Sequence, residues 1–121
     1  MLTELWKYVL RRPRHQVAQR FLVEVHRASA AMPGPVEAEL VNLSRQGFQL
    51  RMSVPLTIQE SIGVRLRVQQ ANLDVTLPGI VQWQQSDDGG KWLVGCQAVH
   101  EVEWETLGEL FLNGVLAVDN P

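Results

Sequence analysis

The chain has 121 residues, of which 45% are hydrophobic and 20% charged, a composition typical of one soluble globular domain with a real core. No apolar stretch approaches the roughly 20 residues that a membrane-spanning helix needs, and the first residues lack the pattern of a secretory signal. Cys96 is the single cysteine, so no disulfide can form within the chain. We therefore expect a cytoplasmic protein without membrane insertion.

The net charge of −2 is unevenly distributed along the sequence. Residues 1–27 carry six cations and two carboxylates, whereas the remaining residues carry five cations and eleven carboxylates. An acidic body argues against DNA or RNA as a partner, because nucleic-acid binding draws its affinity from a large basic surface. The basic amino-terminal part suits a small phosphate-bearing ligand, or it only keeps a helix end in contact with water.

Apolar residues at the start of the chain recur at the spacing of a helix with one apolar face, and Pro13 should end that helix. These residues are Leu2, Leu5, Trp6, Val9 and Leu10. Basic residues continue beyond Pro13 as far as Arg20. We assign residues 1–19 to an amino-terminal helix and basic arm.

From Arg20 onward apolar residues alternate with polar ones, which is the period of a half-buried β-strand. Pro78-Gly79 inside one of these stretches predicts a bulge or a bend, and Asp87-Asp88-Gly89-Gly90 predicts a hairpin loop. The alternation predicts strands near residues 20–28, 36–41, 48–53, 64–69, 73–83 and 92–99.

A second helix is predicted after Glu103, where Trp104, Leu107 and Phe111 lie at helical spacing, and Asn113-Gly114 should end it. Short antiparallel strands flanked by two helices predict a mainly β fold, a six-stranded antiparallel β-barrel formed by residues 20–121 as a single domain. We expect the four Trp and three Phe of the chain to be buried and to supply much of its stability.

The stretch Asn42-Leu43-Ser44-Arg45-Gln46-Gly47 lies between two predicted strands. Asn42 and Ser44 are two positions apart and should point to one side of an extended chain. Gly47 allows a positive φ or a close backbone approach. Short polar residues also stabilise ordinary turns, so the same stretch could be a turn that binds nothing.

This stretch and the sequence around it resemble the PilZ domain family, from about Arg11 to Phe111. The family's second signature is Asp or Asn, any residue, Ser, two residues and Gly, and residues 42–47 match it fully. The later Gly79-Ile80-Val81-Gln82-Trp83 and Trp92-Leu93-Val94-Gly95-Cys96-Gln97 resemble the family's closing strands. The resemblance implies a six-stranded barrel that binds cyclic di-GMP, a bacterial second messenger.

The family's first signature is two arginines separated by three residues, just before the first strand. Arg20 falls where the second arginine belongs, but Gln16 stands in place of the first. An Arg fork can bind guanine O6 and N7 or a phosphate, so losing one such contact should cost roughly 1.5–3 kcal/mol. Arg11, Arg12 and Arg14 could compensate if the arm folds back over the barrel.

The resemblance also implies roles for single residues. Arg20 would hold a phosphate or a guanine edge, and Asn42 a base or a phosphate. Ser44 would bind a phosphate oxygen, and Gly47 would keep the backbone clear. The arm, mobile without ligand, would clamp cyclic di-GMP against the turn and thereby signal to a protein partner in motility, exopolysaccharide or pilus regulation.

Two other interpretations remain open. A degenerate barrel that no longer binds the nucleotide would act as a protein-protein interaction module, and the terminal helices could join two copies in a homodimer. An enzyme, a metal site or a further cofactor is not expected, because the histidines, Cys96 and Ser44 show no catalytic or metal-binding spacing.

Overall fold

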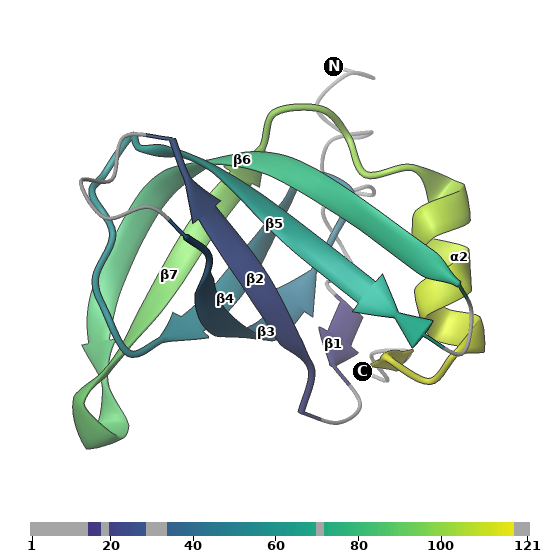
Figure 1. The fold of residues 1–121 in the computed structure, drawn as a ribbon, viewed down its shortest axis with the longest axis horizontal. Helices are drawn as coiled ribbons and strands as arrows, with labels where there is room; N and C mark the ends of the chain where they lie inside the picture. Colours follow the sequence, from purple (N-terminus) through teal and green to yellow (C-terminus); the bar gives the residue numbers. More distant parts are fainter. Residues whose placement is uncertain (1–14, 18–19, 29–33, 70–71, 118–121) are drawn as a thin grey trace, which may run out of the picture.

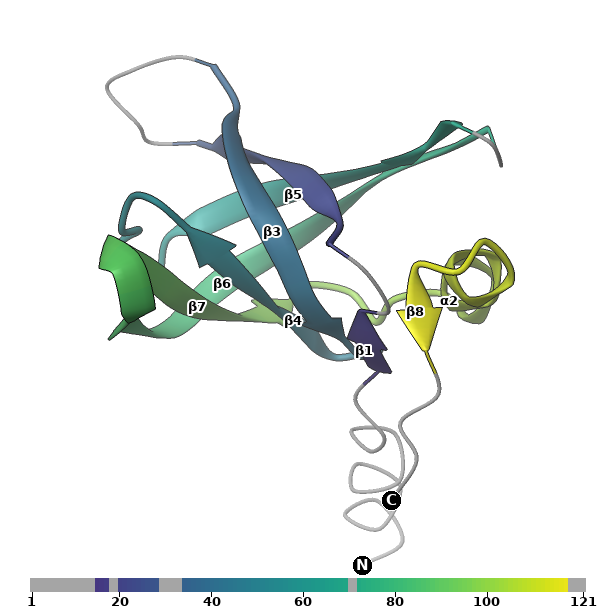
Figure 2. The ribbon, with the colours of Figure 1, turned by 90° about the horizontal axis from the view of Figure 1, so that it is seen from below.

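The described part of the chain is mainly β, with strands wrapped into a barrel and an α-helix beside it (Figures 1 and 2). This computed structural model describes residues 15–17, 20–28, 34–69 and 72–117. The predicted amino-terminal helix lies outside these residues, as do Arg11, Arg12 and Arg14.

Six antiparallel strands close the barrel. In sequence order they are β2 (Leu22–Arg27), β3 (Val36–Leu43), β4 (Gly47–Met52), β5 (Ser61–Val68), β6 (Leu73–Asp87) and β7 (Lys91–Ala98). Around the barrel they follow the order β2-β5-β6-β7-β4-β3, and β3 pairs with β2 to complete the ring. The predicted six-stranded antiparallel barrel is therefore confirmed.

Alternate residues of the strands fill the interior of the barrel, as a period of two requires. In β4, Phe48, Leu50 and Met52 are buried, while Gln49 and Arg51 between them are only partly covered. This alternation turns Gln49 and Arg51 toward the outer face of the barrel.

β6 is fifteen residues long and serves two neighbours, because its first half pairs with β5 and its second half with β7. The strand continues through Pro78-Gly79 without interruption, and its register shift lies between Val81 and Trp83 instead. Of the bulge or bend predicted at Pro78-Gly79, the bulge is therefore wrong in position. Gly79 is needed for packing, since a Cβ there would lie 2.6 Å from the ring of Phe48.

Two short strands extend β3 beyond the ring. β1 (His15–Val17) pairs with the end of β3, and β8 (Leu116–Ala117) pairs with β1, so the two lie side by side in Figure 2. The sequence predicts neither strand, because two or three residues carry no periodic signal. Together they join the segment before the barrel to the segment after the helix.

The helix α2 (Trp104–Leu112) lies where the sequence predicts, and its predicted apolar face points inward except at Trp104. Leu107 and Leu110 are buried, whereas Trp104 is 61% and Leu112 84% exposed. The prediction that the tryptophans are buried is therefore wrong for Trp104, since Leu107, Leu110 and the partly buried Phe111 pack this helix against the core. No helix within the described ranges is long and apolar enough to cross a membrane.

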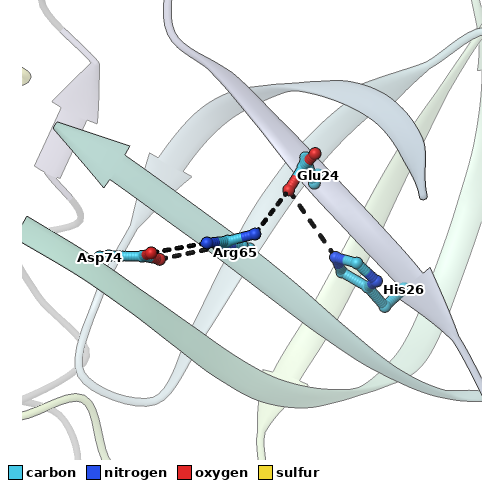
Figure 3. Close-up of polar contacts among 4 residues, drawn as sticks. All are labelled: Glu24, His26, Arg65 and Asp74. Carbon is cyan, nitrogen blue, oxygen red and sulfur yellow. Dashed lines mark hydrogen bonds and ion pairs between the residues drawn. The ribbon is translucent and has the colours of Figure 1, made fainter. Parts of the chain in front are cut away.

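Ion pairs cover the outer face where β2, β5 and β6 lie side by side (Figure 3). Arg65 donates hydrogen bonds to both carboxylate oxygens of Asp74, at 2.9 and 2.6 Å, and contacts Glu24 at 3.5 Å. His26 lies 3.9 Å from the same Glu24 carboxylate. All four side chains are at least 34% exposed, so these pairs belong to the solvated surface.

Candidate functional site

The signature stretch forms the tight turn between β3 and β4. The Ser44 N–H donates to the Gly47 carbonyl at 2.9 Å. The Ser44 hydroxyl lies 3.3 Å from that same carbonyl oxygen and accepts from the Gln46 N–H, also at 3.3 Å. Ser44 is 6% exposed, so its own turn holds this serine in place, as in other turns stabilised by side chains.

Gly47 makes a close backbone approach, and the partner is the neighbouring strand. A Cβ at this position would collide with the carbonyl oxygen of Cys96 in β7, and its φ is not in the left-handed region. β4 and β7 therefore come too close together here for any side chain at position 47.

Asn42 lies near the end of β3 with its side chain almost fully buried. It is 7% exposed, and its amide has no hydrogen-bond partner among the described residues. In the backbone register it stands opposite Gln49 of β4 and Gln16 of β1. The structure therefore brings the backbones of the two signature segments together at Asn42.

Arg20 lies just before β2 and belongs to a different group of side chains. Its Nε is 3.6 Å from a carboxylate oxygen of Glu39, and its side chain is 71% exposed. Glu39 also contacts Arg51 at 3.2 Å, and Arg51 binds Asp87 at 2.8 Å, which lowers the pKa of the Asp87 carboxylate. A row of alternating charges thus runs along the outside of the barrel, and Arg20 is its most exposed member.

A hollow of about 240 Å³ opens beside the turn on the outer face of β4, β7 and β6. Its lining combines small residues, amide side chains and one indole, including Ser44, Gly47, Gln49, Gln97 and Trp83. All ten lining residues are uncharged. The hollow therefore offers hydrogen bonds and an aromatic surface, but no positive charge of its own.

Trp83 forms one wall of this hollow. It is 38% exposed, which again contradicts the expectation that the tryptophans are buried. Its indole covers Gly95 of β7, where a Cβ would collide with the ring, and the two residues stand opposite each other in the register. Sequence reasoning gave no site role to Trp83, Gln49 or Gln97, although a large residue facing a glycine on the next strand is a signal that could have pointed to Trp83.

Cys96 is a buried residue of β7. Burial raises the pKa of the Cys96 thiol to about 12, so the thiolate that would act as a nucleophile is scarce. Among the residues that the structure describes, no three His, Cys, Asp or Glu side chains gather as metal ligands.

Comparison with known proteins places the chain in a family. The sequence model described as PilZ domain matches residues 11–112. Among solved structures, the inhibitor of motility (MotI/DgrA) of Bacillus subtilis superposes with a TM-score of 0.59 over 84% of this chain, at 11% identity. The match covers 49% of that protein, so the present chain spans about half its length, and the likeness shows the fold alone. No curated protein matches.

The family match runs from the basic arm to the end of α2 and covers the whole barrel. The chain belongs to the PilZ domain family, whose members are cyclic di-GMP receptor and adaptor domains rather than enzymes.

Proposed function

We propose that the chain binds cyclic di-GMP on the outer face of its barrel and passes the signal to a protein partner. The observation that carries the proposal is the position of Asn42, whose buried amide has no hydrogen-bond partner among the described residues. It stands between Gln16 of the arm and Gln49 of the hollow. A buried polar group without a partner costs roughly 1–3 kcal/mol, and a ligand that offers a donor or an acceptor would recover this energy.

The hollow suits a guanine base. The face of Trp83 can stack on a base, a contact that is worth roughly 1–3 kcal/mol in other proteins. The amides of Gln49 and Gln97 can both donate to and accept from the edge of that base. The Ser44 hydroxyl is 3.3 Å from its acceptor in the turn, so it can redirect its proton toward a phosphate oxygen.

The two phosphates of the ligand need positive charge from outside the hollow. Arg20 can supply it, because its 3.6 Å contact with Glu39 is exposed and such pairs contribute less than about 1 kcal/mol. Arg11, Arg12 and Arg14 of the arm would add to it. In this proposal the arm closes over the ligand in the bacterial cytoplasm and changes the surface offered to a partner in motility, exopolysaccharide or pilus regulation.

Calorimetric titration of cyclic di-GMP into the wild type and Asn42→Ala tests this proposal. The fold should persist in Asn42→Ala, because no described side chain loses a hydrogen bond, whereas the affinity should fall by about tenfold to a hundredfold. Gln85→Ala, on an exposed part of β6 outside the hollow, is the matched control and should bind like the wild type. Equal heats of binding from Asn42→Ala and the wild type would show that the turn is not part of the binding site.

Gln16→Arg restores the first signature. An added guanidinium beside Asn42 should tighten binding by about one to two decades, the value of one charge-assisted contact. Unchanged or weaker affinity in the same titration would count against the alignment of Gln16 with the missing arginine.

The uncharged lining of the hollow favours a second function. Together with Gln16 in place of an arginine, it fits a barrel that has lost the nucleotide and acts only as an interaction module. Light scattering with and without cyclic di-GMP separates the two functions. A ligand-dependent mass supports the receptor, whereas a dimer that forms regardless of ligand supports the module.

A further inference from the structure

We propose that the outward face of α2 is a docking surface for a cationic, amphipathic helix of a partner protein. This outer α2 face consists of Trp104, Glu105, Gly108, Glu109 and Leu112. It lies outside the hollow, so docking does not require the nucleotide function proposed above.

Two large apolar side chains on the outer α2 face are mostly exposed. Trp104 is 61% and Leu112 84% exposed, while Leu107 and Leu110 on the other side are buried. Eight residues of helix separate the two exposed side chains by about 12 Å. Exposed apolar surface of this kind, rimmed by polar residues, is typical of a protein interaction site.

Gly108 leaves a gap between these two side chains, four positions from each. A Cβ at Gly108 would meet no atom within 4 Å, and its φ is not in the left-handed region. Neither the packing of the described residues nor the backbone conformation therefore requires a glycine here, which costs about 1 kcal/mol relative to alanine inside a helix. The missing side chain allows another chain to approach the helix backbone closely.

The charges around the face select a cationic partner. Residues 99–117 contain four glutamates and no lysine or arginine. Glu101 pairs with Arg45 at 3.0 Å, whereas Glu105 and Glu109 have no cation at ion-pair distance among the described residues. A second copy of the chain would bring like charges together. An amphipathic helix can place its apolar side over the gap and its lysines or arginines against these carboxylates.

Arg45 belongs to the signature turn and contacts both Trp104 and the segment just before α2. Its guanidinium lies 4.3 Å from the centroid of the Trp104 ring, and its Nε donates to the Val102 carbonyl at 3.0 Å. The Val102 N–H donates back to the Arg45 carbonyl at 2.7 Å. If the proposed function holds, a ligand at the turn acts on the docking surface through these direct contacts.

The test uses two synthetic helical peptides of the same length, titrated calorimetrically into the full chain. One carries leucines on one face and lysines on the other, and the second has glutamates in place of the lysines. The lysine peptide should bind, and the double variant Glu105→Lys/Glu109→Lys should weaken its binding by at least about tenfold. Asp88→Lys, in the exposed β6–β7 hairpin far from α2 (Figures 1 and 2), reverses one carboxylate instead of two. It is the control for added positive charge elsewhere on the surface and should bind like the wild type.

Gly108→Gln separates docking from stability. Glutamine is a better helix former than glycine, so the variant should unfold at a higher temperature and yet bind the lysine peptide about tenfold more weakly. Absent binding to the wild type, equal binding of both peptides, or unaltered binding to Gly108→Gln would overturn the proposal. A wild-type dimer that Leu112→Ser converts to a monomer would also overturn it, because a second copy would then occupy the face.

Discussion

Replacing Glu60 by glutamine tests how far the barrel depends on one buried ion pair. Glu60 lies just before β5, and its side chain is 3% exposed. It accepts hydrogen bonds from Arg27 of β2 at 2.6 and 2.8 Å and from the Thr57 N–H at 2.9 Å. Glutamine keeps the shape of the side chain but removes its charge, so Arg27 loses its counterion.

The cost follows from the burial of the two partners. Removing one partner of a fully buried pair costs about 3–5 kcal/mol. The Arg27 side chain is 24% exposed, so water recovers part of its solvation, and we expect a loss of about 2–3 kcal/mol in the free energy of unfolding. For a chain of this length that loss lowers the Tm by roughly 6–12 °C.

The same pair predicts a pH dependence. The Arg27 guanidinium lowers the pKa of Glu60 below its ordinary value of 4.5. A carboxylate of this kind stabilises the fold above its unfolded pKa, and this contribution is lost as the pH falls through the folded pKa. The difference in stability between wild type and Glu60→Gln should therefore be full near neutral pH and should close in the acid range below 4.5.

Thermal unfolding followed by circular dichroism measures both effects. The control is Asp74→Asn, which breaks the same two-bond geometry with Arg65 on the exposed surface (Figure 3) and should lower the Tm much less. Equal losses in Glu60→Gln and Asp74→Asn, or a difference that persists in acid, would refute the reasoning that burial decides the strength of the pair.

Four further outcomes are expected. Gly95→Ala should lower the free energy of unfolding by about 1–3 kcal/mol, because its methyl group displaces the Trp83 indole. Gly108→Ala, whose methyl group meets open space, should raise the free energy of unfolding by about 1 kcal/mol. Urea unfolding measures both variants, and a wild-type free energy of unfolding in Gly95→Ala would contradict the packing of Trp83 on Gly95. Gly47→Ala should lower the free energy of unfolding in urea even without ligand, because its methyl group collides with the Cys96 carbonyl. A free energy of unfolding equal to that of the wild type would show that β7 can move away from position 47. Cys96 should react slowly with a thiol reagent at about pH 8 until the protein unfolds, because burial raises its pKa to about 12. If Cys96 in the native protein reacted as fast as free cysteine, the thiol would not be buried as described.

The strands of the barrel could be predicted because the alternation of apolar and polar residues is itself the signal that places them. Phe48, Leu50 and Met52 are buried for the reason that their spacing predicts. The closing of the ring by β2 and β3 follows from the number of strands and the need to remove free edges. The turn between β3 and β4 was located from its polar residues and its glycine.

Features that depend on distant contacts could not be predicted in this way. β1 and β8 are defined only by their pairing with each other and with β3. Trp104 lies outside the core with Arg45 over one side of its ring, a contact between residues 59 positions apart that periodicity does not encode. The role of Arg20 and the rest of the arm remains a prediction, since the structure places Arg20 beside Glu39 and not in the hollow.

Among the described residues, two exposed tryptophans, Trp83 and Trp104, give the protein its own optical reporters. Trp83 lines the hollow and Trp104 stands on the outer α2 face, and an indole changes its emission when water around it is replaced. Exchanging either one for phenylalanine would assign a spectral change to the hollow or to α2. A single unlabelled chain could thus report the arrival of a base and the arrival of a partner as separate events, and show in which order they occur.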